Sequence, residues 1–153
     1  MRVSVIGGST VPDRTYEMAR RLGELLAKRD HTVVCGGLTG VMEAVCRGAS
    51  DGKTIGILPG DDPAAANDYV DTAVATGMGN ARNALVVLNG DATIAIDGGT
   101  GTLSELALAL DAGHPVAGIE THRIDGVDGI EHVDTPAGAV DHVETSIDAK
   151  RTG

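Results

Sequence analysis

The hydrophobic residues of this 153-residue chain fall into two alternating patterns. Short, nearly continuous apolar runs are typical of strands that are buried on both faces. They occur at 2–7, 32–35, 53–59, 92–96 and 115–119, with a weaker run at 69–76. Longer stretches with apolar residues at helical spacing predict helices over 12–29, 40–49, 80–90, 102–113 and 135–151. The polar stretch 125–134 shows neither pattern and is predicted to be irregular.

Strands that alternate with helices in this way form a parallel sheet with helices on both faces. The pattern therefore predicts an α/β fold, a Rossmann-like three-layer sandwich with a mostly parallel sheet. The chain contains no internal repeat and no linker, so residues 1–153 are interpreted as a single domain. At the start of the last helix, Thr135 suits the N-cap and Pro136 suits the first helical position.

Three of the predicted strand-to-helix turns are rich in glycine: Gly7–Asp13, Gly36–Gly40 and Gly98–Thr102. In a parallel sheet all such turns lie at the carboxyl edge, where open α/β sheets bind ligands. Glycine lets the backbone approach a bound group, and the following helix offers free N–H groups and partial positive charge. One turn alone is weak evidence, since helix packing can also require glycine. Three turns at one edge favour an anionic, phosphate-bearing ligand.

Two common phosphate-binding motifs are absent. A dinucleotide site needs G-x-G-x-x-G after the first strand, and a P-loop needs Gly-Lys followed by Ser or Thr. The first turn reads GGSTVP, and GGTGTLSE contains no lysine. These sequences argue against an NAD-dependent enzyme and against an NTPase.

The composition excludes several other classes of partner. The formal charge is −10 and no basic stripe exists, which argues against nucleic acid. The chain has no Phe or Trp and only two tyrosines, which argues against binding by aromatic stacking. No apolar run reaches membrane length and none resembles a signal peptide, so a cytoplasmic protein without a membrane partner is predicted.

The abundance of Asp and the scarcity of Lys suggest a further hypothesis, adaptation to a salt-rich cytoplasm. A melting temperature that does not rise between dilute buffer and molar KCl would count against it. The cysteines, Cys35 and Cys46, lack metal-ligand spacing and are predicted to be buried or half-buried, reduced thiols without a metal. His122, His132 and His142 match no ligand spacing and are predicted to lie at the surface. Met42 and Met78 are predicted to fill the core.

The segments CGGLTGVMEAVCRGA, GMGNARN and DGGTGTLSE together resemble the family long labelled possible lysine decarboxylases. That family includes the Lonely Guy-type phosphoribohydrolases, and a related branch includes the molybdenum-cofactor carriers. In the hydrolase branch the third motif reads Pro-Gly-Gly-x-Gly-Thr-x-x-Glu, and an Arg-Lys pair lies upstream. Gly98, Gly99, Gly101, Thr102, Glu105 and Arg82 match these motifs. Asp97 replaces the proline and Asn83 replaces the lysine, and both departures are more similar to the carrier branch. The resemblance also implies a homo-oligomer, a dimer or a tetramer.

Two charged residues have competing interpretations. Thr102 and Glu105 have the spacing of a capping box, in which the glutamate binds a backbone N–H. Alternatively, Glu105 could position water or stabilise a ribosyl cation during N-glycosidic cleavage. Arg82 falls in the first turn of its helix if Asn80 is the N-cap, where a cation opposes the helix dipole. A bound anion would offset this unfavourable interaction of the arginine with the dipole. Alternatively, Arg82 could be solvated at the surface or paired with a neighbouring carboxylate.

The sequence thus leaves three hypotheses. The favoured one is a binding protein for a phosphate-bearing nucleotide or pterin-type cofactor, such as a nucleoside monophosphate or the molybdenum cofactor. The second is a nucleoside 5′-monophosphate phosphoribohydrolase with Arg82 and Glu105 as catalytic residues. The third is a scaffold whose turns only pack. The predicted ligand-binding residues are Gly7, Gly8, Ser9, Gly36, Gly37, Thr39, Gly40, Arg82, Asn83, Gly98, Gly99, Thr100, Gly101 and Thr102.

Overall fold

The computed structural model describes residues 1–153. Its strands are β1 (Arg2–Gly7), β2 (Thr32–Cys35), β3 (Lys53–Leu58), β4 (Thr72–Ala75), β5 (Ala92–Ile96), β6 (Val116–Ile119) and β7 (Ile130–His132). Its α-helices are α1 (Asp13–Lys28), α2 (Val41–Gly48), α3 (Asn83–Leu88), α4 (Thr100–Asp111) and α5 (Pro136–Thr152). Two short 3₁₀ helices, η1 (Pro63–Ala65) and η2 (Gly79–Arg82), complete the fold.

The strands form one seven-stranded sheet in the order β4-β3-β2-β1-β5-β6-β7. Every neighbouring pair is parallel. The predicted Rossmann-like α/β fold is therefore confirmed. From β1 the chain builds outward through β2, β3 and β4, and from β5 it builds in the opposite direction. The carboxyl ends of β1 and β5 consequently flank a topological switch point, where open α/β sheets bind ligands.

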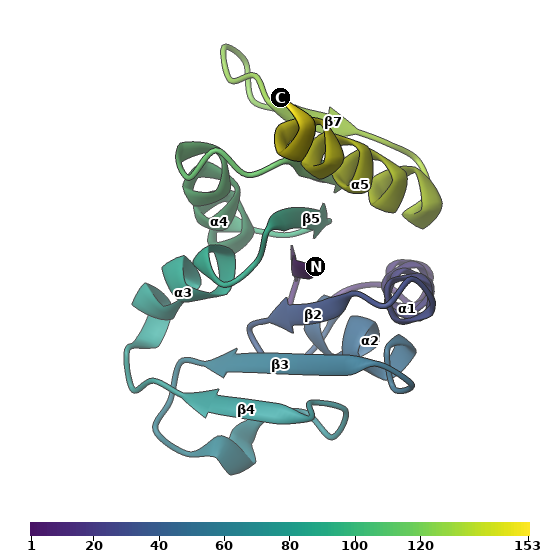
Figure 1. The fold of residues 1–153 in the computed structure, drawn as a ribbon. Helices are drawn as coiled ribbons and strands as arrows, with labels where there is room; N and C mark the ends of the chain where they lie inside the picture. Colours follow the sequence, from purple (N-terminus) through teal and green to yellow (C-terminus); the bar gives the residue numbers. More distant parts are fainter.

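Helices cover both faces of this sheet, as Figure 1 shows. α1, α2 and α5 pack on one face, while α3 and α4 pack on the other. The side chains of β5 alternate between the two layers: Ile94 and Ile96 join the first core, and Ala95 joins the second. This alternation explains the continuous apolar run in the sequence, because a strand covered on both faces has no solvent side.

The predicted start of the last helix is confirmed. Gly138 N–H donates to the Thr135 side chain at 3.1 Å, and Pro136 opens the helix. Three other predictions were wrong. The stretch 125–134 contains the edge strand β7, whose residues are only partly buried and so lack an apolar run. The predicted helix 80–90 divides into η2 and the six-residue α3, so Asn80 is not an N-cap. α4 begins at Thr100, two residues before the predicted start.

None of the helices combines the length and the apolar character that a membrane crossing requires.

Candidate functional site

A cavity of about 340 Å³ opens at the carboxyl edge of the sheet, above the ends of β1 and β5. The turns after β1, β2 and β5 contribute to its wall, as the glycine pattern predicted, and η2 closes another side. Its lining residues are Val5, Ile6, Gly7, Gly8, Ser9, Gly36, Leu38, Met42, Asn80, Arg82, Asn83, Gly99, Thr100, Gly101, Thr102 and Glu105.

The N-terminus of α4 faces this cavity without a side-chain cap. Gly99 is the N-cap residue, and the first helical hydrogen bond runs from Leu103 N–H to the Gly99 carbonyl at 3.0 Å. The N–H groups of Thr100, Gly101 and Thr102 therefore have no acceptor within the helix. Such groups, together with the helix dipole, form a ready anion-binding site.

Two glycines at this helix start have no packing reason to be glycine. A Cβ at Gly99 would meet no atom within 4 Å, and one at Gly101 would meet only the Asn83 side chain at 4.0 Å. At Gly101, which lies inside the helix, glycine also lowers helix stability relative to alanine. Gly98 differs, because its φ is +111° and a Cβ there would lie 2.3 Å from Thr102 Oγ1. Space left open at Gly99 and Gly101 is what close approach of a ligand requires.

Arg82 is buried in the cavity wall, with 8% of its surface exposed. Its Nε donates to the Ile57 carbonyl at 2.9 Å, and its Nη1 donates to Asn83 Oδ1. Arg82 forms no ion pair with any carboxylate. The predicted alternatives, a solvated arginine or an ion pair, were both wrong, as was its place inside a first α-helical turn. Arg82 ends η2 and directly precedes α3. These hydrogen bonds fix the position of the guanidinium, and no ion pair neutralises its charge.

Gly36 creates the space that this arginine needs. A Cβ at Gly36 would lie 2.7 Å from Arg82 Nη2 and 2.7 Å from Met42 Sδ. The second glycine turn therefore admits the guanidinium to the cavity as well as lining it.

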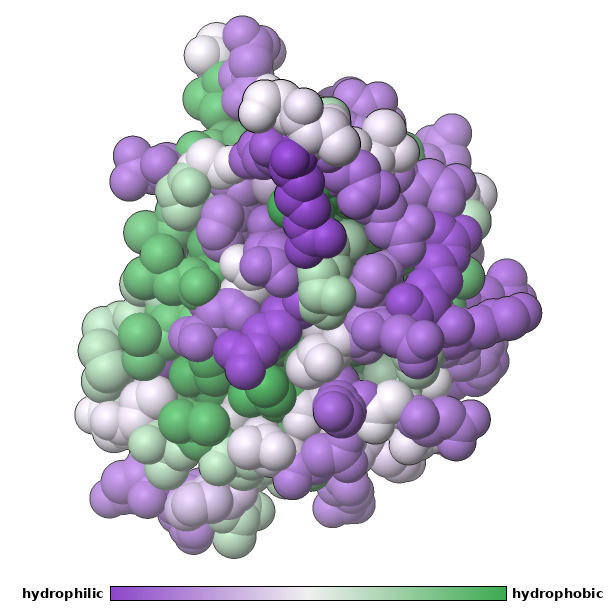
Figure 2. All heavy atoms as spheres, viewed as in Figure 1, coloured by the Kyte–Doolittle hydropathy of each residue, from purple (hydrophilic) through white to green (hydrophobic).

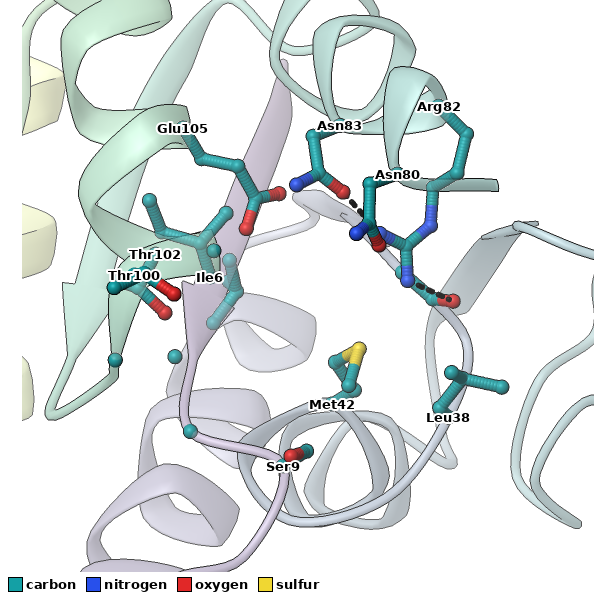
Figure 3. Close-up of a pocket in the computed structure, with 16 residues that line it drawn as sticks. Ile6, Ser9, Leu38, Met42, Asn80, Arg82, Asn83, Thr100, Thr102 and Glu105 are labelled. Carbon is teal, nitrogen blue, oxygen red and sulfur yellow. Dashed lines mark hydrogen bonds between the residues drawn. The ribbon is translucent and has the colours of Figure 1, made fainter. Parts of the chain in front are cut away.

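Glu105 also faces the cavity, and the capping-box interpretation was wrong. Because α4 starts at Thr100, Glu105 is one turn too far along the helix to reach the N-cap, and its carboxylate makes no hydrogen bond to any protein group. The side chain is 9% exposed. Burial raises the pKa of Glu105 to about 7, although the charge of Arg82 acts in the opposite direction. Figure 3 shows the carboxylate pointing into the cavity, toward Asn83.

Most of the predicted ligand-binding residues meet at this cavity, but Gly37, Thr39, Gly40 and Gly98 do not line it. Thr39 and Gly40 instead join the first two turns. Thr39 Oγ1 donates to the Ser9 carbonyl at 2.8 Å, and a Cβ at Gly40 would lie 2.2 Å from the Gly8 carbonyl oxygen. The close packing of these turns positions Gly7, Gly8 and Ser9 at the rim.

Sequence reasoning missed several residues of the site. Asn80, Leu38 and Met42 line the wall, and Met42 also belongs to the core as predicted. Met78 is 48% exposed, so its prediction as a core residue was wrong. His122, predicted only as a surface residue, has its Nε2 2.9 Å from the Gly99 carbonyl oxygen. It follows β6 by three residues, and no local pattern indicates that this loop returns to the α4 turn.

The two cysteines lie beneath the second glycine turn. Both are fully buried, as predicted, and their sulfur atoms are 3.5 Å apart. Gly37 N–H contacts Cys35 Sγ at 3.4 Å. The backbone of the second glycine turn separates both thiols from the cavity, which explains why neither cysteine lines it.

Comparisons with known proteins agree with this geometry. The model of the SLOG cluster4 family matches residues 1–147. This chain belongs to that family. An uncharacterized protein of Archaeoglobus fulgidus is 40% identical over 148 residues, which span 95% of this chain and 96% of the relative.

Two similar solved structures come from proteins that handle the molybdenum cofactor. The molybdenum cofactor binding protein of Rippkaea orientalis has a TM-score of 0.89 and 34% identity, covering 95% of this chain and 96% of its own. The molybdenum cofactor carrier protein of Chlamydomonas reinhardtii has a TM-score of 0.86 and 31% identity, and the match covers 95% of this chain and 97% of that protein.

The same fold extends to more distant proteins. DNA processing protein A of Helicobacter pylori, a single-stranded DNA binder, has a TM-score of 0.73 at 21% identity, covering 97% of this chain and 81% of its own. At this identity the likeness shows a shared fold only.

Proposed function

We propose that this protein binds a phosphate-bearing nucleotide or pterin-type cofactor at the carboxyl edge of its sheet and holds it without chemical change. The observation that carries this proposal is the uncapped start of α4, where open space at Gly99 and Gly101 lies in the same cavity as Arg82. Free N–H groups and an uncompensated guanidinium together suit a phosphate.

The molybdenum cofactor is the favoured pterin-type ligand, because two similar structures belong to proteins that bind or carry it. The residues present fit such a group. The N–H groups of Thr100 and Gly101 would hold its phosphate, with Arg82 supplying charge. The amide side chains of Asn80 and Asn83 offer donors and acceptors to a pterin edge. The cofactor's metal-centred redox chemistry would not be used here, and the residues of this chain would only hold and orient it.

A nucleic-acid partner is not proposed. The net charge of −10 opposes the phosphate backbone of a polynucleotide, whereas one small phosphate group needs only a local site.

A phosphoribohydrolase is the second candidate, and the environment of Glu105 favours it. A buried carboxyl group with a pKa of about 7 is suited to general acid–base catalysis near neutral pH. The departures from the hydrolase motif at Asp97 and Asn83 weigh against this candidate.

One set of variants separates the two functions. At pH 6 in molar KCl, we expect the wild type to bind AMP without releasing adenine. Arg82→Ala should weaken binding about tenfold or more, the scale of a charge-assisted hydrogen bond. Glu105→Gln should bind nearly as well as the wild type. Arg2→Ala is the control, since Arg2 is exposed at the amino end of β1. Release of adenine by the wild type, and its loss in a Glu105→Gln variant that still binds AMP, would establish the hydrolase instead.

We also propose a homo-oligomer that forms through α3 and α4. Leu88 on α3 is 63% exposed and Leu108 on α4 is 37% exposed. Figure 2 shows an apolar region over these two helices, whereas most of the remaining visible surface is polar. In a chain with a net charge of −10, an apolar face with few charged side chains is the surface on which two copies repel each other least.

A further inference from the structure

Glu105 poses an electrostatic problem for the proposed ligand. The same cavity contains the free N–H groups of α4, which attract an anion, and a buried carboxylate, which repels one. The carboxylate has no hydrogen-bond donor in the protein, and Figure 3 shows it aimed into the space that the ligand would fill.

Protonation of Glu105 removes this conflict. Two like charges in a poorly solvated site raise the pKa of the group that can take up a proton. A protonated carboxyl group also gains an O–H donor, which can bind a phosphate oxygen. Burial already brings the pKa of Glu105 to about 7, so the proton is available from neutral water.

We propose that the cavity takes up its anionic ligand together with one proton, which the Glu105 carboxyl group holds. The proton comes from solvent when the anion binds and returns to solvent when the anion leaves, so no bond of the ligand changes. The protein would then hold its ligand more tightly in acidic solution and release it more readily as the pH rises. This inference rests on the proposed anion site.

Other charged or titratable groups surround the same space. Arg82 on η2 is a cation that acts electrostatically on Glu105. Cys35 at the end of β2 interacts electrostatically with Glu105. Asp97 borders the turn after β1, and His122 contacts the Gly99 carbonyl. Protonation of His122 would also strengthen anion binding at low pH, so an experiment must separate it from Glu105.

The experiment uses sulfate, because its charge does not change over the range from about pH 5.5 to pH 8.5. Calorimetric titration should give a wild-type association constant that is constant well below pH 7 and falls by up to about tenfold per pH unit above it. Glu105→Gln should show no such fall, whereas His122→Gln should retain it. Wild-type titrations above pH 7, in two buffers of different ionisation enthalpy, should show uptake of up to one proton per sulfate bound.

The possible failures are distinct. If the wild type binds sulfate with a pH-independent affinity, or if Glu105→Gln keeps the wild-type slope, the proton-coupled mechanism is wrong and the anion site remains. If the slope disappears in His122→Gln, His122 holds the proton and the assignment to Glu105 is wrong. If the wild type binds neither sulfate nor AMP at any pH, the proposed function fails, and this inference fails with it.

Discussion

The face of the sheet that carries α1, α2 and α5 buries a cluster of 21 residues, whereas the face that carries α3 and α4 buries nine. On the first face the helix backbones touch. A Cβ at Gly23 of α1 would lie 2.0 Å from the Val45 carbonyl oxygen of α2. On the second face α3 is only six residues long, and Leu88 and Leu108 are exposed.

The site draws its charged groups from the thinner face. Arg82 directly precedes α3 and Glu105 lies on α4, while α1 contributes no residue to the cavity wall. A buried cation without a counter-ion and a buried carboxylate without a donor both cost stability. The comparison indicates that the α1–α2–α5 face supplies stability and that the α3–α4 face gives up some stability to place charged groups at the cavity.

The largest expected effect is on the α1–α2–α5 face. Leu26→Ala removes a fully buried side chain from the larger core and should lower the free energy of unfolding by about 2–5 kcal/mol. Sulfate affinity of the folded fraction should not change, because Leu26 is remote from the cavity wall. Urea denaturation and calorimetry measure the two quantities. A loss below about 1 kcal/mol would contradict the division between the two faces.

The next effect concerns the stability cost of Glu105. Its pKa is about 7 in the folded protein, against an ordinary value of 4.5. Below pH 4.5 the carboxyl group is neutral in both the folded and the unfolded protein, so its ionisation does not lower the free energy of unfolding. As the pH rises to 7 the unfolded state ionises first, so the folded state loses up to about 3 kcal/mol of relative stability. Glu105→Gln should therefore stabilise the protein more at pH 8 than at pH 4. Glu131→Gln, at an exposed position, is the control. If Glu105→Gln changed the free energy of unfolding equally at both pH values, ionisation of Glu105 would not destabilise the folded protein.

A smaller effect should separate stability from binding at the start of α4. Gly101→Ala should raise the free energy of unfolding by about 0.5–1 kcal/mol, because alanine is the better helix former and its Cβ meets no obstacle. The same methyl group should weaken sulfate binding severalfold by intruding on the ligand space. Ala107→Gly, exposed in the same helix, should do the reverse: it should lower stability and leave binding intact. Unchanged binding in Gly101→Ala would mean that no ligand approaches this turn.

The smallest effect on the folding of each chain is expected at the exposed leucines. Leu88→Ser should change the free energy of unfolding of a single chain by less than about 0.5 kcal/mol. It should nevertheless lower the solution mass toward the 15.5 kDa of one chain, as measured by light scattering. Val127→Ser removes an equally apolar, 43% exposed residue from the loop before β7 and serves as the control. A monomeric wild type would refute the proposed interface.

The sequence alone determined the order of strands and helices and the edge at which the glycine turns meet. Both follow from local patterns, since apolar runs and helical spacing report burial directly, and a parallel sheet brings all strand-to-helix turns to one edge. Arg82 and Glu105 could also be singled out, because a charge within an apolar helical segment is conspicuous in any context. The strand β7 escaped prediction because an edge strand is only partly buried and needs no apolar run.

The tertiary structure decided which of these residues face the cavity. A helix start at Thr100 or Thr102 differs by little in local free energy. In the folded chain the helix starts at Thr100, the Thr102 side chain is buried, and Glu105 lies beyond reach of the cap. Gly40 and Gly101 look alike in sequence, yet one packs against the Gly8 backbone and the other faces open space. His122 reaches the Gly99 carbonyl only because β6 lies beside β5. These contacts join segments that are distant along the chain, and a local sequence pattern cannot show which distant segments will lie side by side.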